Sequence, residues 1–553
     1  MKKYSAINHK LKIILISILS VIMFVIFVSI LSIKVLSPFK VSIYNYESYL
    51  NTKTITSLKQ KYSYHAFTNL DELTRAINNK KAVAGVGSDY QIAQLIVEKK
   101  LRKINFSKVF GINFKNDEEV LARYPQILKN NFNIFNDWII AEIKKKNPDN
   151  IIQENWDKIS YSSFIPFIYY NEKNEIIGFE IDGKPGIDNY FQFLIPYFIL
   201  DKMIVYNIDK EKNETTDRTN VKEGVSFDDV NNQRTWFDIL KTLTSKYKTP
   251  RVYWTNWFQD NAMLGQFYAY ENGDLSQKNG ELWKDLDKDN YKYIMNSFLD
   301  LVKNGTGHSI KNSNYNKLVT DGQELVSTII EPKNGKADIS IMYNGDALDA
   351  YYGEDNFERL GPNPHVSFIR PQNSYMNIDA WIVSRDTDDN ELDALLETLN
   401  EILFKNAVST QDEITQLYLE EVYSLISEKK EDSQNYITQN LFKDNEMKIA
   451  KNASEISEEF YKKYYDEFKE AFASQNLPFI ENFDVINYTP AYEYTNAFLK
   501  EWYFLDENKK PNLEAIKIFN AGQDPDTSYR TYQPIHLGLR TNIIDYYYET
   551  TKS

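Results

Sequence analysis

The chain has 553 residues, of which 64 are basic and 78 acidic, so its net charge is −14, and it contains no cysteine. The missing cysteines exclude disulfides, thiolate nucleophiles and thiolate metal sites. Residues 1–40 hold six lysines and no acidic residue, so the remaining chain carries 58 basic against 78 acidic side chains, a net of −20. Such a surface repels nucleic acid and attracts cations, although ordinary solubility explains most of these charges equally well.

An apolar segment near the N-terminus, residues 13–33, holds 21 residues without a charge. As a helix it is about 31 Å long, enough to cross a hydrocarbon core of about 30 Å. Four lysines precede it, so the positive-inside bias predicts a cytoplasmic N-terminus and an extracytoplasmic chain after Leu36. No small-residue cleavage site follows, which favours a retained anchor over a cleaved signal peptide. We therefore expect residues 1–36 to be a cytoplasmic tail and transmembrane signal anchor of a single-pass cell-membrane protein.

The next part of the chain alternates between strands and helices. We expect strands over residues 40–44, 65–67 and 82–87, and helices beginning at residues 57, 70 and 90. This β-α-β-α-β-α series predicts a parallel sheet, in which ligands sit outside the carboxyl ends of the strands. Tyr46, Ser88 and Tyr90 fall at such ends.

The middle of the chain is less regular in its pattern. The expected elements are a hairpin over 164–181, strands over 193–197 and 202–206, a loop over 208–233, a helix over 236–243 and a strand over 252–255. Residues 411–472 are highly charged and have a helical period, which predicts an inserted helical pair or bundle.

Four short segments place aromatic rings and carboxylates where strands end: residues 44–49, 87–90, 342–345 and 377–380. A ring face attracts an ammonium group and a carboxylate forms a charge-assisted hydrogen bond with it, so the combination suits a flexible organic cation. Each of these residues also has a purely structural explanation. The tyrosines fit a core, Ser88 and Asp260 fit helix caps, and Asp379, beside an apolar strand, fits an internal arginine pair.

Motifs of catalysis are missing from the sequence. Its five histidines show no HExxH or paired-ligand spacing, and it has no GxSxG elbow, no Walker A loop and no GxGxxG after a strand. We therefore expect no enzyme, no catalytic residue, no metal site and no cofactor.

The four segments that place rings and carboxylates at strand ends also resemble, in the same order, segments of a known family. This family is the extracytoplasmic spermidine/putrescine-binding protein of polyamine ABC transporters, which has the type II periplasmic-binding-protein fold. Residues 44–49 resemble the family's Tyr-Asn-Trp-x-x-Tyr, and residues 87–90 its Pro-Ser-x-Tyr. Residues 337–345 resemble its strand ending in Trp-Asn-Gly, and residues 377–379 its Trp-Met-Asp. Weaker matches at 195–207, 236–240, 488–490 and 532–548 extend the resemblance from about residue 41 to 550.

The resemblance implies an α/β, two-lobed periplasmic-binding-protein-like fold with a ligand cleft, an N-terminal transmembrane anchor and a helical insertion. Lobe 1 would hold residues 41–198 and 379–405, lobe 2 residues 199–378 and 485–553, and the charged helical insertion residues 406–484. The implied function is a membrane-anchored solute-binding protein that captures a polyamine and delivers it to an ABC permease. The implied ligand-binding residues are Tyr46, Tyr49, Ser88, Tyr90, Trp257, Asp260, Tyr343, Asp379 and Gln533.

Within this set, Asp260 and Asp379 would pair with ammonium groups, Ser88 and Gln533 would be neutral acceptors, and the rings would wall the aliphatic stem. Trp257 stands where the family has an aspartate, so we expect the site to suit two ammonium groups better than three. Two alternatives remain open. One is a receptor for thiamine or ferric ion on the same fold, and the other is a membrane-anchored adhesin or interaction protein that acts through residues 406–484.

Overall fold

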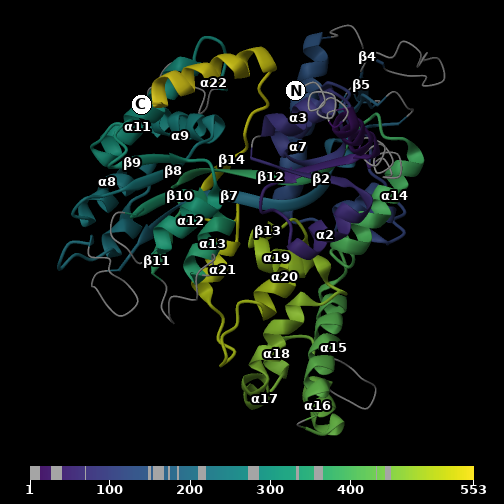
Figure 1. The fold of residues 1–553 in the computed structure, drawn as a ribbon. Coiled ribbons are helices and arrows are strands. Elements are labelled where there is room, and N and C mark those ends of the chain that lie inside the picture. Colours follow the sequence, from purple (N-terminus) through teal and green to yellow (C-terminus); the bar gives the residue numbers. More distant parts are fainter. Residues whose placement is uncertain are drawn as a thin grey trace, which may run out of the picture.

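A computed structural model shows a mixed α/β molecule built around one large sheet (Figure 1). It describes residues 11–552 except 12, 27–39, 69, 147–150, 153–166, 172, 174, 183–185, 210–219, 272–284, 332–335, 354–364, 431 and 443–449. The strands of the sheet are β1 (Ser42–Tyr46), β2 (Ser63–Phe67), β3 (Ala82–Ser88), β7 (Ile195–Asn207), β8 (Val252–Thr255), β9 (Asn316–Val319), β10 (Ile339–Tyr343), β11 (Val366–Ile369), β12 (Asn373–Val383), β13 (Thr489–Pro490) and β14 (Ser528–Arg530). They are ordered β2-β1-β3-β12-β7-β10-β8-β9, with β11 and β13 on β7 and β14 on β12.

The N-terminal part of the sheet is parallel, as the alternating pattern predicts. Strand β1 pairs in parallel with both β2 and β3, and the connecting helices are α2 (Thr52–Lys61), α3 (Leu70–Asn78) and α4 (Asp89–Val97). Helix α2 begins earlier than expected because the Asn51 side chain accepts a hydrogen bond from the Thr54 backbone amide at 2.7 Å. At Gly85 a Cβ atom would lie 2.5 Å from the Leu73 side chain and 2.6 Å from the Tyr44 carbonyl oxygen, so only glycine lets α3 pack this closely on β3.

The two strands expected around residue 200 are a single 13-residue strand, β7, whose every residue is buried. The break expected between residues 197 and 202 is wrong, because the charge of Asp201 has a buried partner, as does that of Lys202, the first residue of the second expected strand. The Asp201 carboxylate accepts two hydrogen bonds from the Arg370 guanidinium at 2.7 and 3.0 Å, and the Lys202 ammonium lies 2.7 Å from the Asp260 carboxylate. Paired in this way, the charges are tolerated in the middle of a core strand.

Strands β7 and β12 lie antiparallel at the centre of the sheet and link β3 on one side to β10 on the other. The predicted lobe boundaries, 198/199 and 378/379, fall inside these two strands. The division into two lobes therefore stays a prediction. Strands β7 and β12 each run without a break across the predicted boundary between the lobes.

The second half of the sheet is flanked by α8 (Trp236–Lys246), α9 (Phe258–Glu271), α11 (Tyr291–Thr306), α12 (Gly322–Ile330), α13 (Asn344–Tyr352) and the C-terminal α22 (Leu537–Thr551). Here β10 and β9 both run parallel to β8, while β10 is antiparallel to β7. The helix expected over 236–243 and the strand expected over 252–255 are both present. The segment expected as a loop contains one short 3-10 helix, η4 (Asp228–Asn232), and residues 210–219 lie outside the described chain.

Between β3 and β7 the chain forms a small second sheet and several helices. The elements are α5 (Phe106–Phe110), α6 (Asp117–Leu121), α7 (Gln126–Lys146), β4 (Ile151–Ile152), β5 (Phe167–Tyr170), β6 (Ile176–Glu180) and the 3-10 helix η3 (Tyr190–Phe193). The antiparallel pair β5–β6 is the hairpin expected over 164–181. Residues 164–166, 172 and 174 of this hairpin lie outside the described chain, as do residues 183–185 of the loop that follows it.

The later helices are α14 (Asp389–Leu399), the π-helix η5 (Asn400–Phe404), α15 (Gln411–Lys429), α16 (Gln434–Leu441), η6 (Ala453–Glu455), α17 (Glu458–Lys463), α18 (Tyr465–Glu470), η7 (Ala471–Ala473), α19 (Pro478–Ile486), α20 (Glu493–Trp502) and α21 (Leu513–Phe519). Helices α15 to α18 extend away from the sheet (Figure 1). They have their own core. In it the Tyr418 ring stacks on the Phe472 ring, with centroids 4.8 Å apart, and its centroid lies 5.4 Å from that of Trp502 in α20. The insertion was expected to end at residue 484, which falls inside α19, and this core also includes residues of α20 beyond that position.

The described part of the predicted anchor, residues 13–26, is helical with exposed apolar side chains. Residues 27–33 of that prediction lie outside the described chain. Across the residues that the structure describes, no helix combines the length and apolar character needed to span a membrane.

Candidate functional site

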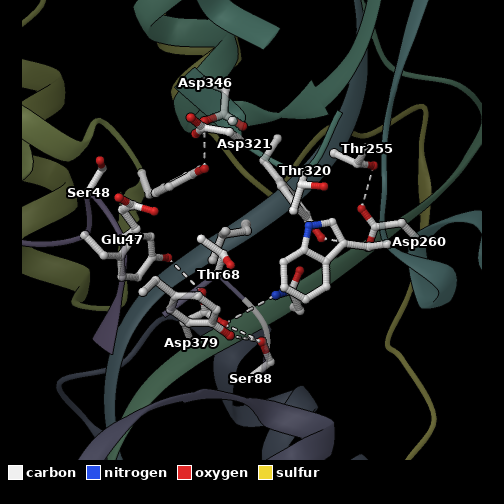
Figure 2. Close-up of a pocket in the computed structure, with 18 of the residues that line it drawn as sticks. Glu47, Ser48, Thr68, Ser88, Thr255, Asp260, Thr320, Asp321, Asp346 and Asp379 are labelled. Carbon is white, nitrogen blue, oxygen red and sulfur yellow. Dashed lines mark hydrogen bonds between the residues drawn. The ribbon is translucent and has the colours of Figure 1, made fainter. Parts of the chain in front are cut away.

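A pocket of about 170 Å³ lies where strands from both halves of the sheet end (Figure 2). The carboxyl ends of β1, β3, β8 and β10 reach it, as expected for ligand sites on such sheets. It is lined by eight of the nine predicted site residues: Tyr46, Tyr49, Ser88, Tyr90, Trp257, Asp260, Tyr343 and Asp379. Residues that are distant in sequence therefore converge on one cavity.

Asp379 lies in the middle of β12, opposite Ser88 of β3, and is 4% exposed. Its two carboxylate oxygens accept hydrogen bonds from the Tyr49 hydroxyl and the Ser88 hydroxyl, each at 2.7 Å. Within the described chain no cation pairs with this carboxylate. Burial raises the pKa of Asp379 to about 6, an effect that the Ser88 and Tyr49 hydrogen bonds only partly oppose.

Ser88 occupies the N-cap position of α4, yet its side chain makes no capping hydrogen bond. Its hydroxyl instead donates to Asp379 and shares a hydrogen bond of 3.0 Å with the Tyr46 hydroxyl. Ser88 is therefore at the expected cap position but does not cap the helix with its side chain, because the hydroxyl is held by the carboxylate.

Asp260 is the most connected carboxylate of the pocket, and its partners differ from those expected. The Lys202 ammonium lies 2.7 Å from Oδ2, which also accepts from the Thr255 hydroxyl at 2.8 Å. Oδ1 accepts from the Tyr343 hydroxyl at 3.0 Å and from the Tyr532 hydroxyl at 2.5 Å. Burial alone would raise the pKa of Asp260, but Lys202 and the hydroxyls of Tyr532 and Thr255 hold it below its usual value. Asp260 therefore already has an internal cation.

Asp346 is another buried carboxylate of the pocket, and it is absent from the residues predicted from the sequence. It lies in the first turn of α13, lines the pocket and accepts a hydrogen bond from the Tyr488 hydroxyl at 2.9 Å. Burial raises its pKa to about 6, opposed by the Tyr488 hydrogen bond and by the more distant charge of Lys202. Figure 2 shows Asp346 beside Asp321 at one side of the pocket and Asp379 beside Ser88 at the opposite side.

Tyr488 and Tyr49 lie between these two carboxylates, with ring centroids 5.5 Å apart. Each donates its hydroxyl to one of them, Tyr488 to Asp346 and Tyr49 to Asp379. Tyr488 needs a glycine beneath it, because a Cβ atom on Gly345 would lie 2.2 Å from its ring. The sequence signals for these residues were present, since Gly345 and Tyr488 both belong to segments that resemble the family.

Gln533 does not line the pocket, so the structure does not bring it together with the other eight predicted residues. Its amide oxygen accepts from the Leu286 backbone amide at 2.6 Å and its amide nitrogen donates to the Leu286 carbonyl at 3.0 Å. The preceding residue, Tyr532, lies in the pocket wall instead, with its ring 5.2 Å from Tyr90. Trp257 lines the pocket and is partly exposed.

A metal centre finds no support in the residues that the structure describes, where no cluster of three or more histidine, aspartate or glutamate side chains is placed to hold an ion.

Comparisons with known proteins give structural matches only. No family model matches the chain, and no curated protein matches it. A protein of Listeria monocytogenes provisionally described as a spermidine/putrescine ABC transporter is 12% identical, with 92% of this chain and 98% of that chain covered and a TM-score of 0.44. The spermidine/putrescine ABC transporter substrate-binding protein PotD of Streptococcus pneumoniae is 13% identical, with 93% and 98% covered and a TM-score of 0.42.

A third structure, the TpPotD lipoprotein of Treponema pallidum, is 12% identical over 66% of this chain and 82% of its own, with a TM-score of 0.34. This chain is thus similar to substrate-binding proteins of ABC transporters. At such low TM-scores and identities the similarity assigns it no ligand.

Proposed function

We propose that this protein is an extracytoplasmic solute-binding protein that captures a small organic cation, a polyamine such as putrescine or spermidine, and delivers it to an ABC permease. The observation that carries the proposal is that two of the buried carboxylates lining one pocket, Asp379 and Asp346, have no ion-pair partner in the described chain.

Burial without a cation is costly for an ionised carboxylate. Asp379 keeps its charge only at the expense of folding free energy, as its raised pKa of about 6 indicates. A ligand with an ammonium group would replace the lost hydration by a charge-assisted hydrogen bond, which is stronger than a neutral one. The same argument applies to Asp346, so the pocket favours a ligand with two separated positive charges.

Aromatic rings supply the second part of the argument. The pocket wall between the two carboxylates contains Tyr49 and Tyr488, and Tyr46 lies 5.2 Å from Tyr49. Ring faces pack against methylene groups and attract ammonium groups. An aliphatic diamine therefore matches the pocket both along its stem and at its ends.

The alternatives fit less well. A ferric site would need a cluster of oxygen and nitrogen ligands, and the described residues contain no group of three or more histidine, aspartate or glutamate side chains placed to hold an ion. Thiamine carries one fixed positive charge, so it leaves one of the two carboxylates without a partner. An adhesin acting through residues 406–484 would give no reason for buried carboxylates in a pocket outside that region.

Membrane attachment through residues 13–33 belongs to the same proposal. A receptor tethered beside its permease stays at a high local concentration, which fits the apolar segment and the four lysines before it. Detection of a new N-terminus near residues 34–40 by mass spectrometry would show a cleaved signal peptide instead.

A thermal-shift panel on the full-length protein in detergent tests the function. Putrescine, spermidine, thiamine, ferric citrate and sodium chloride at equal ionic strength are the arms. A ligand at 100 times its Kd stabilises by about 2.7 kcal/mol, so the amines should raise the unfolding midpoint while thiamine, iron and salt do not. A shift with thiamine or iron alone would replace the polyamine assignment, and no shift in any arm would remove it.

A further inference from the structure

Lys202 provides the strongest clue to which amine the pocket accepts. It lies in the middle of β7, its side chain is 0% exposed, and its ammonium is 3.6 Å from the centroid of the Tyr343 ring and 5.9 Å from that of Tyr375. The same ammonium lies 2.7 Å from Asp260. An aromatic face with an adjacent carboxylate is the environment that an amine ligand would need, and here a side chain of the protein already occupies it.

The donors around Asp260 leave no room for another cation. An ionised carboxylate has about four lone-pair positions. Four donors fill them at Asp260: Lys202 and Thr255 on Oδ2, and Tyr343 and Tyr532 on Oδ1. A further ammonium at this point would have no acceptor, and it would also meet the positive charge of Lys202.

Asp379 and Asp346 differ in this respect. Asp379 has two close donors, the hydroxyls of Tyr49 and Ser88, while the Asn377 amide is 3.5 Å away. Asp346 accepts from the Tyr488 hydroxyl and from the Tyr343 backbone. Both carboxylates line the pocket and have fewer donors than Asp260, so they keep acceptor capacity.

We propose that Lys202 is a built-in ammonium group that fills the Asp260 position, so that the pocket selects a ligand with two positive charges, placed at Asp379 and Asp346, over one that brings a third charge to Asp260. This inference rests on the proposed function and names the substrate class more closely. It makes Lys202 a specificity-determining residue: the wild type should prefer a diamine to a triamine.

Replacement of the lysine by a neutral side chain of similar length tests the assignment. In full-length Lys202→Met, Asp260 has lost its cation and is open to a third ammonium. Calorimetric titration at pH 7.5 should show the spermidine-to-putrescine affinity ratio rising about 30-fold or more over wild type, since a buried charge pair contributes at least about 2 kcal/mol. The matched control, Lys202→Met with Asp260→Asn, lacks both charges and should show no such rise. A folded Lys202→Met protein with the wild-type ratio would overturn the proposal.

A measurement on the wild type covers the case in which Lys202→Met does not fold. Acetylation of one terminal amine converts spermidine into a dication of nearly the same length. If Lys202 fills the third position, the acetylated compound should bind wild type at least as tightly as spermidine. A loss of about tenfold or more on acetylation, the scale of one lost charge contact, would show that the third position is open and overturn the proposal.

A separate result distinguishes failure of this inference from failure of the receptor function. If no amine binds the wild type at millimolar concentration, the receptor proposal fails. The Lys202→Ala variant then tests by itself whether an ammonium group occupies the position beside Asp260. Added butylamine should restore the thermal unfolding midpoint of Lys202→Ala. It should not restore the midpoint of the double variant Lys202→Ala with Asp260→Asn. The same midpoint with and without butylamine would overturn the assignment of Lys202 as a built-in ammonium.

Discussion

Asp260 and Asp379 lie in the wall of one pocket, and both are almost fully buried, yet their surroundings are opposite. Asp260 has the Lys202 cation and a complete set of donors, whereas Asp379 has two hydroxyl donors and no cation in the described chain. Their pKa values move in opposite directions, that of Asp260 below and that of Asp379 above the usual value. A buried carboxylate therefore indicates a ligand site only after its internal partners are known.

The largest expected effect is on stability, at the satisfied carboxylate. Asp260→Asn leaves the Lys202 ammonium buried without a counter-charge, because Lys202 is 0% exposed. We expect the free energy of unfolding to fall by about 3–5 kcal/mol. Denaturant unfolding of the variant beside wild type in the same detergent measures it. An unchanged unfolding midpoint would mean that the ion pair does not hold this part of the sheet together.

The same substitution at the unsatisfied carboxylate should act on binding instead. Asp379→Asn removes a buried charge, so we expect no loss of stability and a loss of putrescine affinity of about 2–5 kcal/mol. Calorimetry measures the affinity and denaturant unfolding the stability. Equal affinity in the variant, or a stability loss as large as that of Asp260→Asn, would remove the distinction between the two residues.

Much of this site could be predicted from the sequence, because parallel strands bring their carboxyl ends to one edge. That rule predicts that Tyr46, Ser88 and Tyr90 lie close together, and all three line the one pocket. The partners of Asp260 could not be predicted. Lys202 is 58 positions away in the chain, and a local pattern cannot show that a charge in an apolar run has a buried counter-charge.

Asp346 was missed for a related reason. It lies in the first turn of the helix that follows β10, but its burial depends on Tyr488, which is 142 positions later in the chain. The resemblance placed the segments that contain both residues without indicating that they meet. Tyr532 lines the pocket and its neighbour Gln533 does not, because the sequence of an irregular segment does not fix which of two neighbouring side chains faces a pocket.

A smaller effect is expected from packing at the Asp346 end. Gly345→Ala puts a methyl group 2.2 Å from the Tyr488 ring and displaces it. Overpacking of this kind lowers the free energy of unfolding by about 1–3 kcal/mol. It should also weaken putrescine binding, because Tyr488 positions Asp346. Gly538→Ala, on an open face of α22, is the matched control and should change neither quantity. Wild-type affinity in Gly345→Ala would show that Tyr488 does not shape the site.

The smallest expected effect is the dependence of affinity on pH. Asp379 and Asp346 have pKa values raised from 3.8 to about 6, so their contribution to folding is fully present below pH 3.8 and is lost as the pH rises through about 6. Unliganded stability should therefore fall over this window, joined by Asp89, whose pKa burial raises to about 7. Putrescine affinity should rise about tenfold or more from pH 5 to 7.5, as the carboxylates ionise. A flat affinity profile in calorimetry would contradict this.

Proton release on binding tests the central claim most directly, because it reports the carboxylates themselves. At pH 6 the unliganded Asp379 and Asp346 are each about half protonated, given pKa values of about 6. A dication that pairs with both lowers those pKa values and should release roughly one proton in total, measured by calorimetry of putrescine binding in buffers of different ionisation enthalpy. The account predicts this release at pH 6, its reduction to about half in Asp379→Asn and its disappearance at pH 8. Putrescine binding at pH 6 without proton release would contradict it.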